Sequence, residues 1–323
     1  MTEPTATEKH RTELTAYCYR MLGSGFEAED AVQETLLRAW RHRDRFDPEK
    51  AALRTWLYSI ATNVCLDMLR SPQRRARAMD LAPPSRPGDP LGAPLPEHMW
   101  VQPVPDSRVL PGTGDPAELA AQRETIRLAF VAALQHLPPR QRAVLILRDV
   151  LRFSAAEAAT LLDTGVASVN SALQRARATM TAVPRHDTYD PLDQDQRRFL
   201  TRYVEAFEKH DVDTLVAVLR EDVVMSMPPF GWWLSGRADV GAVISAPGQP
   251  CENDRALLTA ANGCPALAQY RDGNGFALAV LELAGGRIAE TTTFLDAPRL
   301  FPLFGLPMSF PGGVRTTSGT AEH

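Results

Sequence analysis

The chain has 323 residues, of which 44% are hydrophobic, so we expect a globular protein with two or three domains. No apolar run reaches the roughly 20 residues of a membrane span, and the N-terminal segment lacks the apolar core of a signal peptide. These absences predict a cytoplasmic protein without a membrane partner. The net charge of −4 is uneven, because residues 119–186 are net basic and residues 187–323 are net acidic, so only the first of these segments suits a polyanion.

The sequence shows no pattern of metal ligands and no catalytic constellation. Its four cysteines, Cys18, Cys65, Cys251 and Cys264, lie far apart and form no CxxC pair, which favours buried thiols over disulfides. None of the seven histidines forms a recognisable set with Asp, Ser or another metal ligand. We therefore predict no metal, no cofactor and no enzymatic reaction.

Residues 8–78 read as helices. An apolar stripe over residues 14–22 predicts the first helix, and Gly23 to Gly25 ends it. A second helix is predicted from Glu27, because acidic residues in its first turn complement the helix dipole. Four of its side chains are expected to point inward: Val32, Leu36, Ala39 and Trp40.

Residues 55–70, TWLYSIATNVCLDMLR, predict an amphipathic helix with a broad apolar stripe. Trp56 lies at the border of that stripe, Asn63 on the polar face, and an arginine cluster follows the helix. Such a set can hold unstacked bases and their phosphates. An ordinary bundle helix with a solvated face explains the same pattern.

Residues 79–118 are rich in Pro and Gly and predict an extended linker. Its one apolar patch, at residues 98–101, indicates either docking or a tether packed lightly on its neighbours. Helices return from residue 119. Ser154 and Glu157 form a predicted capping box, and residues 163–165 form a turn before a helix over about 167–180. Two helices joined by a tight turn predict a helix-turn-helix; a plain helical hairpin is the alternative. Its second helix should bury Val166, Val169, Leu173, Ala176 and Met180.

Two stretches carry a family resemblance. EDAVQETLLRAWRHRDRF followed by LRTWLYSIATNVCLDMLRS resembles the second region of bacterial sigma factors of the extracytoplasmic-function (ECF) group. LPPRQRAVLILRDVLRFSAAEAATLLDTGVASVNSALQRARA resembles their fourth region, and the two occur in the family's order. The resemblance implies that the helix carrying DAVQETLLRAW, residues 30–40, docks on the largest subunits of core RNA polymerase. It also implies that residues 55–70 melt and read the −10 element, and that the helix-turn-helix reads the −35 element.

Three sets of site residues follow from this resemblance. The expected core-polymerase contacts are Asp30, Gln33, Glu34, Arg38 and Arg41. The expected −10 contacts are Trp56, Asn63, Arg70, Arg74 and Arg75. The expected −35 contacts are Ser168, Asn170, Ser171, Gln174, Arg175 and Arg177, whose amide and guanidinium groups can pair with base edges.

The chain continues beyond the helix-turn-helix with two helices, over residues 193–210 and 211–219. Strand patterns and hairpin turns then predict a curved antiparallel sheet. This α+β order resembles the SnoaL-like, nuclear-transport-factor-like cone, which encloses a pocket. Five residues are candidates to line that pocket: Trp232, Trp233, Tyr270, Phe276 and Asp296. For Trp232, Trp233 and Phe276 the favoured interpretation is that they fill the core of the cone.

The predicted fold is multidomain, with two all-α sigma domains and a C-terminal α+β SnoaL-like cone. The predicted order is sigma region 2 (8–78), linker (79–118), sigma region 4 (119–183), SnoaL-like domain (190–312) and disordered tail (313–323). We predict a sigma factor that binds core RNA polymerase and promoter DNA and whose own C-terminal domain modulates its activity. The alternative is a DNA-binding ligand sensor, or a cyclase-like enzyme fusion, whose pocket binds or converts a small molecule.

Overall fold

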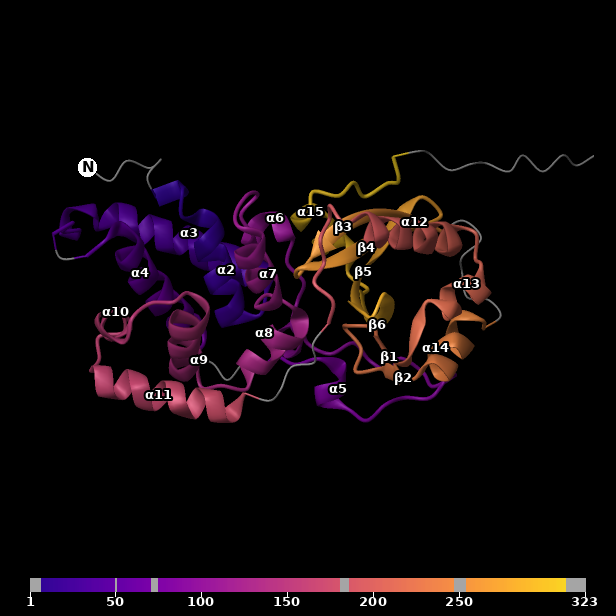
Figure 1. The fold of residues 1–323 in the computed structure, drawn as a ribbon, viewed down its shortest axis with the longest axis horizontal. Coiled ribbons are helices and arrows are strands. Elements are labelled where there is room, and N and C mark those ends of the chain that lie inside the picture. Colours follow the sequence, from indigo (N-terminus) through magenta and orange to yellow (C-terminus); the bar gives the residue numbers. More distant parts are fainter. Residues whose placement is uncertain (1–6, 50, 71–74, 181–185, 247–253, 312–323) are drawn as a thin grey trace, which may run out of the picture. The chain divides into compact units, whose positions relative to one another are not determined.

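The computed structural model describes residues 7–49, 51–70, 75–180, 186–246 and 254–311 (Figure 1). The predicted tail over 313–323 lies outside these ranges. The chain forms two compact units. The helical unit comprises Met1–Leu81, Leu95–Thr188 and Ala261–Cys264, and the sheet unit comprises Ala82–Pro94, Tyr189–Ala260 and Pro265–His323. Among the described helices, none has the length and hydropathy needed to cross a membrane.

Three helices, α2 (Arg11–Leu22), α3 (Gly25–Arg41) and α4 (Leu53–Met68), pack together at the start of the helical unit. Helix α2 ends at Gly23, whose left-handed φ of 72° suits a residue without a side chain. Ser24 then caps α3, because its side chain accepts the amide N–H of Glu27 at 3.3 Å. The predicted break between these helices is thus a C-cap followed directly by an N-cap. Cys18, Cys65 and Cys264 are buried, as predicted, and Cys251 lies outside the described residues.

Residues 95–124 fold onto the helical unit and are not a free tether. The segment contains η2 (Glu97–Met99), α6 (Asp106–Val109) and α7 (Pro116–Glu124), and it follows the short α5 (Ala78–Leu81) of the same unit. Val101, Val104 and Val109 are buried within it. The segment lacks the regular spacing of apolar residues that marks a helix or strand. It still packs on the helical unit, because a few single apolar side chains are buried.

The second half of the helical unit contains α8 (Leu128–Gln135), α9 (Pro139–Leu145), η3 (Ile146–Val150), α10 (Ala155–Leu161) and α11 (Val166–Thr179). The predicted capping box is confirmed, since Ser154 Oγ accepts the Glu157 N–H and Glu157 accepts the Ser154 N–H. Val169, Leu173 and Ala176 are buried as predicted. Val166 was expected in the core but is 44% exposed, because it occupies the first turn of α11, ahead of the packed part of the helix.

The turn at residues 261–264 belongs to the helical unit. Its Asn262 is completely buried, and its side-chain amide donates to Tyr19 Oη at 2.5 Å and to the Ile126 carbonyl at 2.7 Å. Asn262 Oδ1 in turn accepts the Val104 N–H at 3.0 Å. The next residue, Gly263, has a φ of 71°, and a Cβ there would lie 2.9 Å from the backbone oxygen of Arg123. Glycine is therefore required at this position.

Asp106 gives the helical unit a predicted pH dependence. Its carboxylate accepts the Gly263 N–H at 2.8 Å, and burial raises its pKa from 3.8 to about 6. Between pH 4 and 6 the unfolded chain has lost this proton while the folded chain keeps it, so stability falls as pH rises. We expect the free energy of unfolding of Asp106→Asn, relative to that of wild type, to rise by about 2 kcal/mol from pH 4 to pH 7. Urea unfolding of both proteins at pH 4 and at pH 7 measures this difference.

The exposed Asp44→Asn serves as the control for Asp106→Asn and should show no such trend. An unfolding free-energy difference between Asp106→Asn and wild type that stays constant with pH would contradict the assignment of the shift to Asp106.

The sheet unit contains one six-stranded sheet in the order β2-β1-β6-β5-β4-β3. Its strands are β1 (Leu219–Ser226), β2 (Trp233–Ser235), β3 (Arg255–Ala261), β4 (Cys264–Arg271), β5 (Asn274–Ala284) and β6 (Arg287–Phe294). The prediction of a purely antiparallel sheet is wrong, because β1 pairs in parallel with β6. Hairpins join the later strands, but β1 meets β6 from far away in the sequence, so no turn signal marks that pairing.

Four helices accompany the sheet: α12 (Gln194–Glu208), α13 (Val212–Ala217), α14 (Arg237–Ile244) and α15 (Ala297–Leu303). Asp193 and Asp211 cap α12 and α13 through their side chains. Residues 82–94 belong to this unit, since Trp233 Nε1 donates to the Ala82 carbonyl and Ser85 N–H to the Trp233 carbonyl, both at 2.8 Å. The sheet unit thus includes a piece of the predicted linker.

Candidate nucleic-acid interface

The polar face of α4 presents a continuous stripe. Trp56, Ser59, Asn63, Asp67 and Arg70 follow one another at spacings of three or four, so they lie along one side of the helix and its C-terminal end. Trp56 packs on Phe46 with ring centroids 5.1 Å apart and is half-buried. The stripe therefore combines a ring fixed at one end with polar groups that solvent can reach.

Asn63 is the most available polar group of this stripe. It is exposed, and its amide makes no side-chain hydrogen bond to any residue that the structure describes. Arg70 is 82% exposed and pairs with Asp67 at 2.9 Å, while Asp67 also lies 3.6 Å from Arg38. Arg74 falls outside the described residues. An unpartnered amide followed by an exposed cation can reach a base edge and a phosphate.

The predicted core-binding residues lie on α3. Asp30, Gln33 and Arg41 are exposed, whereas Glu34 and Arg38 are half-buried and pair with each other at 2.6 Å. Trp40 was expected to point inward but is 56% exposed, and Leu37 is 39% exposed beside it. Leu37 follows Gln33 by four residues and Trp40 follows Leu37 by three, so they share a face of the helix and give this surface an apolar centre.

Helix α11 presents all six of its predicted −35 residues to solvent: Ser168, Asn170, Ser171, Gln174, Arg175 and Arg177. Arg175 donates to Ser171 Oγ at 2.7 Å, and Arg177 binds Asp149 through two hydrogen bonds of 2.8 and 2.6 Å. Asp149 therefore partly neutralises Arg177 and fixes its direction. The remaining polar groups extend from a helix that α10 supports, as a major-groove reading helix requires.

Comparisons with known proteins agree with this geometry. Residues 7–75 match the model of Sigma-70 region 2, and residues 127–180 match that of Sigma-70 region 4. The ECF RNA polymerase sigma factor SigG of Mycobacterium tuberculosis is 44% identical over 315 residues, covering 94% of this chain and 83% of SigG. The chain belongs to the ECF sigma factor family.

Another similar protein is the ECF sigma factor SigJ of Mycobacterium tuberculosis, which is 32% identical over 219 residues, covering 68% of this chain and 62% of SigJ. The crystal structure of SigJ superposes with a TM-score of 0.60 at 23% identity, covering 95% of this chain and all of that one. The match extends over both units. Two helical sigma regions followed by a C-terminal unit of one mixed sheet with helices are therefore confirmed as the fold of this sigma factor.

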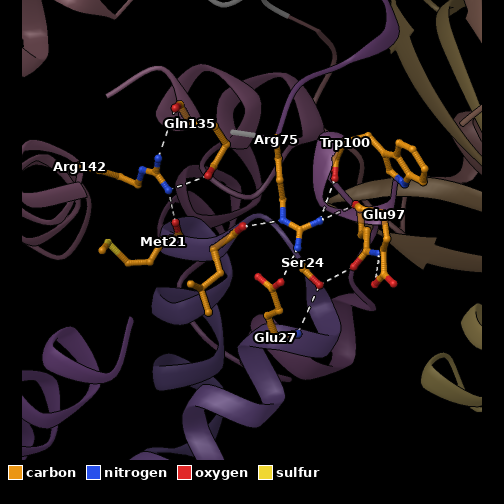
Figure 2. Close-up of polar contacts among 10 residues, drawn as sticks. Met21, Ser24, Glu27, Arg75, Glu97, Trp100, Gln135 and Arg142 are labelled. Atoms are coloured by element: carbon orange, nitrogen blue, oxygen red, sulfur yellow. Dashed lines mark hydrogen bonds and ion pairs between the residues drawn. The ribbon is translucent and has the colours of Figure 1, made fainter. Parts of the chain in front are cut away.

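One predicted DNA contact of this sigma factor needs correction. Arg75 is only 2% exposed and cannot reach a phosphate in this structure. Its guanidinium donates to the Leu22 carbonyl at 3.0 Å. It also donates to the Glu97 and Trp100 carbonyls at 2.9 and 3.2 Å and to Glu27 at 2.6 Å, and these contacts can be followed in Figure 2. Arg75 thereby holds the end of α2, the start of α3 and residues 97–100 together.

A second buried arginine acts at the same helix end. Arg142 of α9 donates to the Met21 carbonyl and, at 2.6 Å, to Gln135 Oε1 (Figure 2). The last carbonyls of a helix have no partner within the helix and carry partial negative charge, so two guanidinium groups can satisfy them. Burial lowers the pKa of Arg142 to about 10, so it stays charged at neutral pH. Region 4 is thus bonded directly to region 2.

The sheet unit of this sigma factor has a cavity of about 490 Å³. Trp232 and Phe276 line it, as proposed from the sequence. Trp233, Tyr270 and Asp296 are not among the lining residues. Tyr270 points to the other side of β4, where its ring packs on Phe301 with centroids 5.2 Å apart. Neighbouring residues of an extended chain face opposite sides. Trp233 is therefore turned away from the cavity that Trp232 lines, and Tyr270 from the cavity that Arg271 lines.

Proposed function

We propose that this sigma factor docks on core RNA polymerase through α3 and reads the two promoter elements with α4 and α11. The observation that carries this proposal is the exposed, unpartnered Asn63 on the polar stripe of α4, together with the exposed polar face of α11. The exposed Leu37 and Trp40 support an apolar centre for the docking surface. No reaction is assigned to the sigma factor, because nucleotide transfer belongs to the polymerase.

The arrangement of regions 2 and 4 supports a closed resting state. Phe153 at the start of α10 stacks edge-on against Tyr58 of α4, with centroids 5.3 Å apart. The −10 and −35 elements are about 25 base pairs apart, which is roughly 85 Å at about 3.4 Å per base pair. Helices α4, α10 and α11 are only about 24, 10 and 21 Å long. While Phe153 touches Tyr58, these helices therefore cannot engage both elements.

We further propose that the C-terminal part of the chain modulates this opening. Residues 261–264 join β3 to β4, yet Asn262 is hydrogen-bonded to Tyr19, to Ile126 and to Val104 inside the helical unit. These bonds support a closed state that the C-terminal sequence helps to stabilise. Loss of this turn should therefore shift the protein toward the open state.

Run-off transcription with core polymerase tests the reading assignments. With Asn63→Ala, we expect the preference for the intact promoter over a −10-substituted promoter to fall by about tenfold, because a base contact contributes about 1–3 kcal/mol. The preference over a −35-substituted promoter should be retained. Asn170→Ala is the matched control and should show the reverse pattern.

Core-polymerase affinity should be unchanged in both variants, because neither asparagine lies on α3. If Asn63→Ala lowers core affinity as much as −10 preference, α4 is a bundle helix and not the reading element. Absence of any promoter-dependent transcript from the wild-type protein would refute the sigma assignment itself.

A second candidate function, ligand sensing, is favoured by the cavity of the sheet unit. Its volume of about 490 Å³ lies within the range of small-molecule sites. We propose binding and not turnover there. Binding of a small molecule by the full chain, measured without polymerase or DNA, would test this function independently of transcription.

A further inference from the structure

The cavity of the sheet unit has an apolar body. Helices α12, α13 and α14 contribute Phe207, Leu215 and Val243, and strands β1 and β5 contribute Met225 and Leu281. Trp232 adds a large aromatic surface whose indole Nε1 is buried without a hydrogen-bond partner among the described residues. Such walls suit a ring-containing molecule, because they offer contact area with few hydrogen bonds to satisfy.

The polar end of the cavity is built around Arg271. Its guanidinium lies 3.6 Å from the centroid of the Phe276 ring, and both residues line the cavity. Its Nε is 3.7 Å from Asp254 Oδ1, too far for a hydrogen bond, and that buried nitrogen has no other hydrogen-bond partner in the described chain. Stacking on Phe276 fixes the orientation of the guanidinium while its charge is only loosely compensated.

The charges around this end favour an anion facing Arg271. Among the residues that the structure describes, Arg271 is the single basic residue that lines the cavity. Two of the described lining residues are acidic: Asp89 accepts the Arg86 N–H at 2.7 Å, and Asp254 approaches Arg271 at its Nε. The Arg271 side chain retains 34% exposure, so part of its guanidinium is accessible. A planar guanidinium with an accessible edge binds carboxylate-type anions.

Residues 88–91 form a strap along the cavity. Gly88, Asp89 and Leu91 all line it, and their segment is held to β2 by the two bonds between residues 82–85 and Trp233. A molecule in the cavity therefore touches the segment that follows region 2. A ligand that contacts Leu91 binds more tightly when the strap is docked. Such a ligand therefore stabilises the docked conformation of the strap.

We infer that this cavity binds an amphipathic organic acid, with its rings among the apolar walls and its anionic group at Arg271, beneath the strap of residues 88–91. This inference rests on the ligand-sensing function proposed above and names its ligand class. The site couples an organic acid to the segment between the two promoter-reading regions.

Two fluorescent probes with the same ring system test the inference on the full chain. Anilinonaphthalene sulfonate (ANS) carries an anion, and N-phenyl-1-naphthylamine (NPN) does not. We expect wild type to bind both, and Arg271→Gln to weaken ANS about tenfold while changing NPN less than about twofold. Ala279→Trp, which fills the cavity, should abolish binding of both probes. Leu258→Trp adds the same ring on the exposed surface of β3 and should change neither.

The strap is tested with Leu91→Ser, which should weaken both probes about fivefold by removing an apolar contact. Equal ANS affinity in wild type and Arg271→Gln overturns the anion assignment. Unchanged binding of both probes by a folded Ala279→Trp variant overturns the site, and unchanged binding by Leu91→Ser overturns the role of the strap. Since no polymerase or DNA is present, these outcomes are separate from failure of the sigma assignment.

Discussion

Replacing Arg75 with Met is expected to lower the free energy of unfolding by about 3–5 kcal/mol, because it removes one partner of a buried ion pair. Arg75 is 2% exposed and bonds Glu27 at 2.6 Å. It also satisfies the carbonyls of Leu22, Glu97 and Trp100. Methionine fills much of the same volume but leaves these acceptors buried without a donor, which adds to the cost. Urea unfolding of the variant and wild type gives the difference.

The matched control for Arg75 is Arg70→Met. Arg70 is 82% exposed and pairs only at the surface with Asp67, so its replacement should change the unfolding free energy by less than about 1 kcal/mol. Binding to single-stranded −10 DNA should instead weaken in Arg70→Met, with a smaller dependence on salt concentration. If Arg75→Met lost DNA binding while keeping wild-type stability, the structural role of Arg75 would be contradicted. Arg75 would then be a phosphate contact.

Replacing Phe153 with Ala is expected to open the closed arrangement of regions 2 and 4. The Phe153 ring is buried, lies 5.3 Å from the Tyr58 ring and has the Arg54 guanidinium 4.8 Å from its centroid. Both partners belong to α4, so the contacts exist only while region 4 is packed on region 2. We expect a loss of about 2–3 kcal/mol from the closed state, which raises the open population roughly 30- to 150-fold.

Run-off transcription at limiting sigma factor measures this opening, and yield should rise in the order wild type, Phe153→Leu, Phe153→Ala. A variant on the other side of the contact guards against damage to region 4. Arg54→Gln removes the cation from the ring and should raise the yield in the same direction by about fivefold. Lower yield from both Phe153→Ala and Arg54→Gln, with circular dichroism unchanged, would show that the packed arrangement is the active one.

Features set by near neighbours in the chain could be predicted closely. The Ser154–Glu157 capping box depends on residues three apart, and it forms as predicted. The polar face of α11 is likewise set by the helical repeat, since Val169, Leu173 and Ala176 are buried and the six −35 residues are exposed. The spaced identities that carry the family resemblance are also properties of the sequence.

Features set by distant segments could not be predicted in this way. Arg70 and Arg75 belong to one arginine cluster, yet one is exposed and the other buried. The difference arises because the carbonyls at the end of α2 and residues 97–100 surround Arg75, and no local pattern indicates their approach. Trp40 also resembles a core residue in the sequence, but it is 56% exposed, with the Arg43 guanidinium 5.3 Å from the centroid of its ring.

The sequence by itself determined the family, the two helical sigma regions, the α+β C-terminal domain and the polar faces of α4 and α11. Only the tertiary structure decided that β1 runs parallel to β6, that Phe153 joins region 4 to region 2, and that Arg271 is the basic residue lining the cavity. The physical reason is that helix faces and caps follow from interactions within a few residues. Burial and charge pairing depend on segments that meet only when the chain has folded.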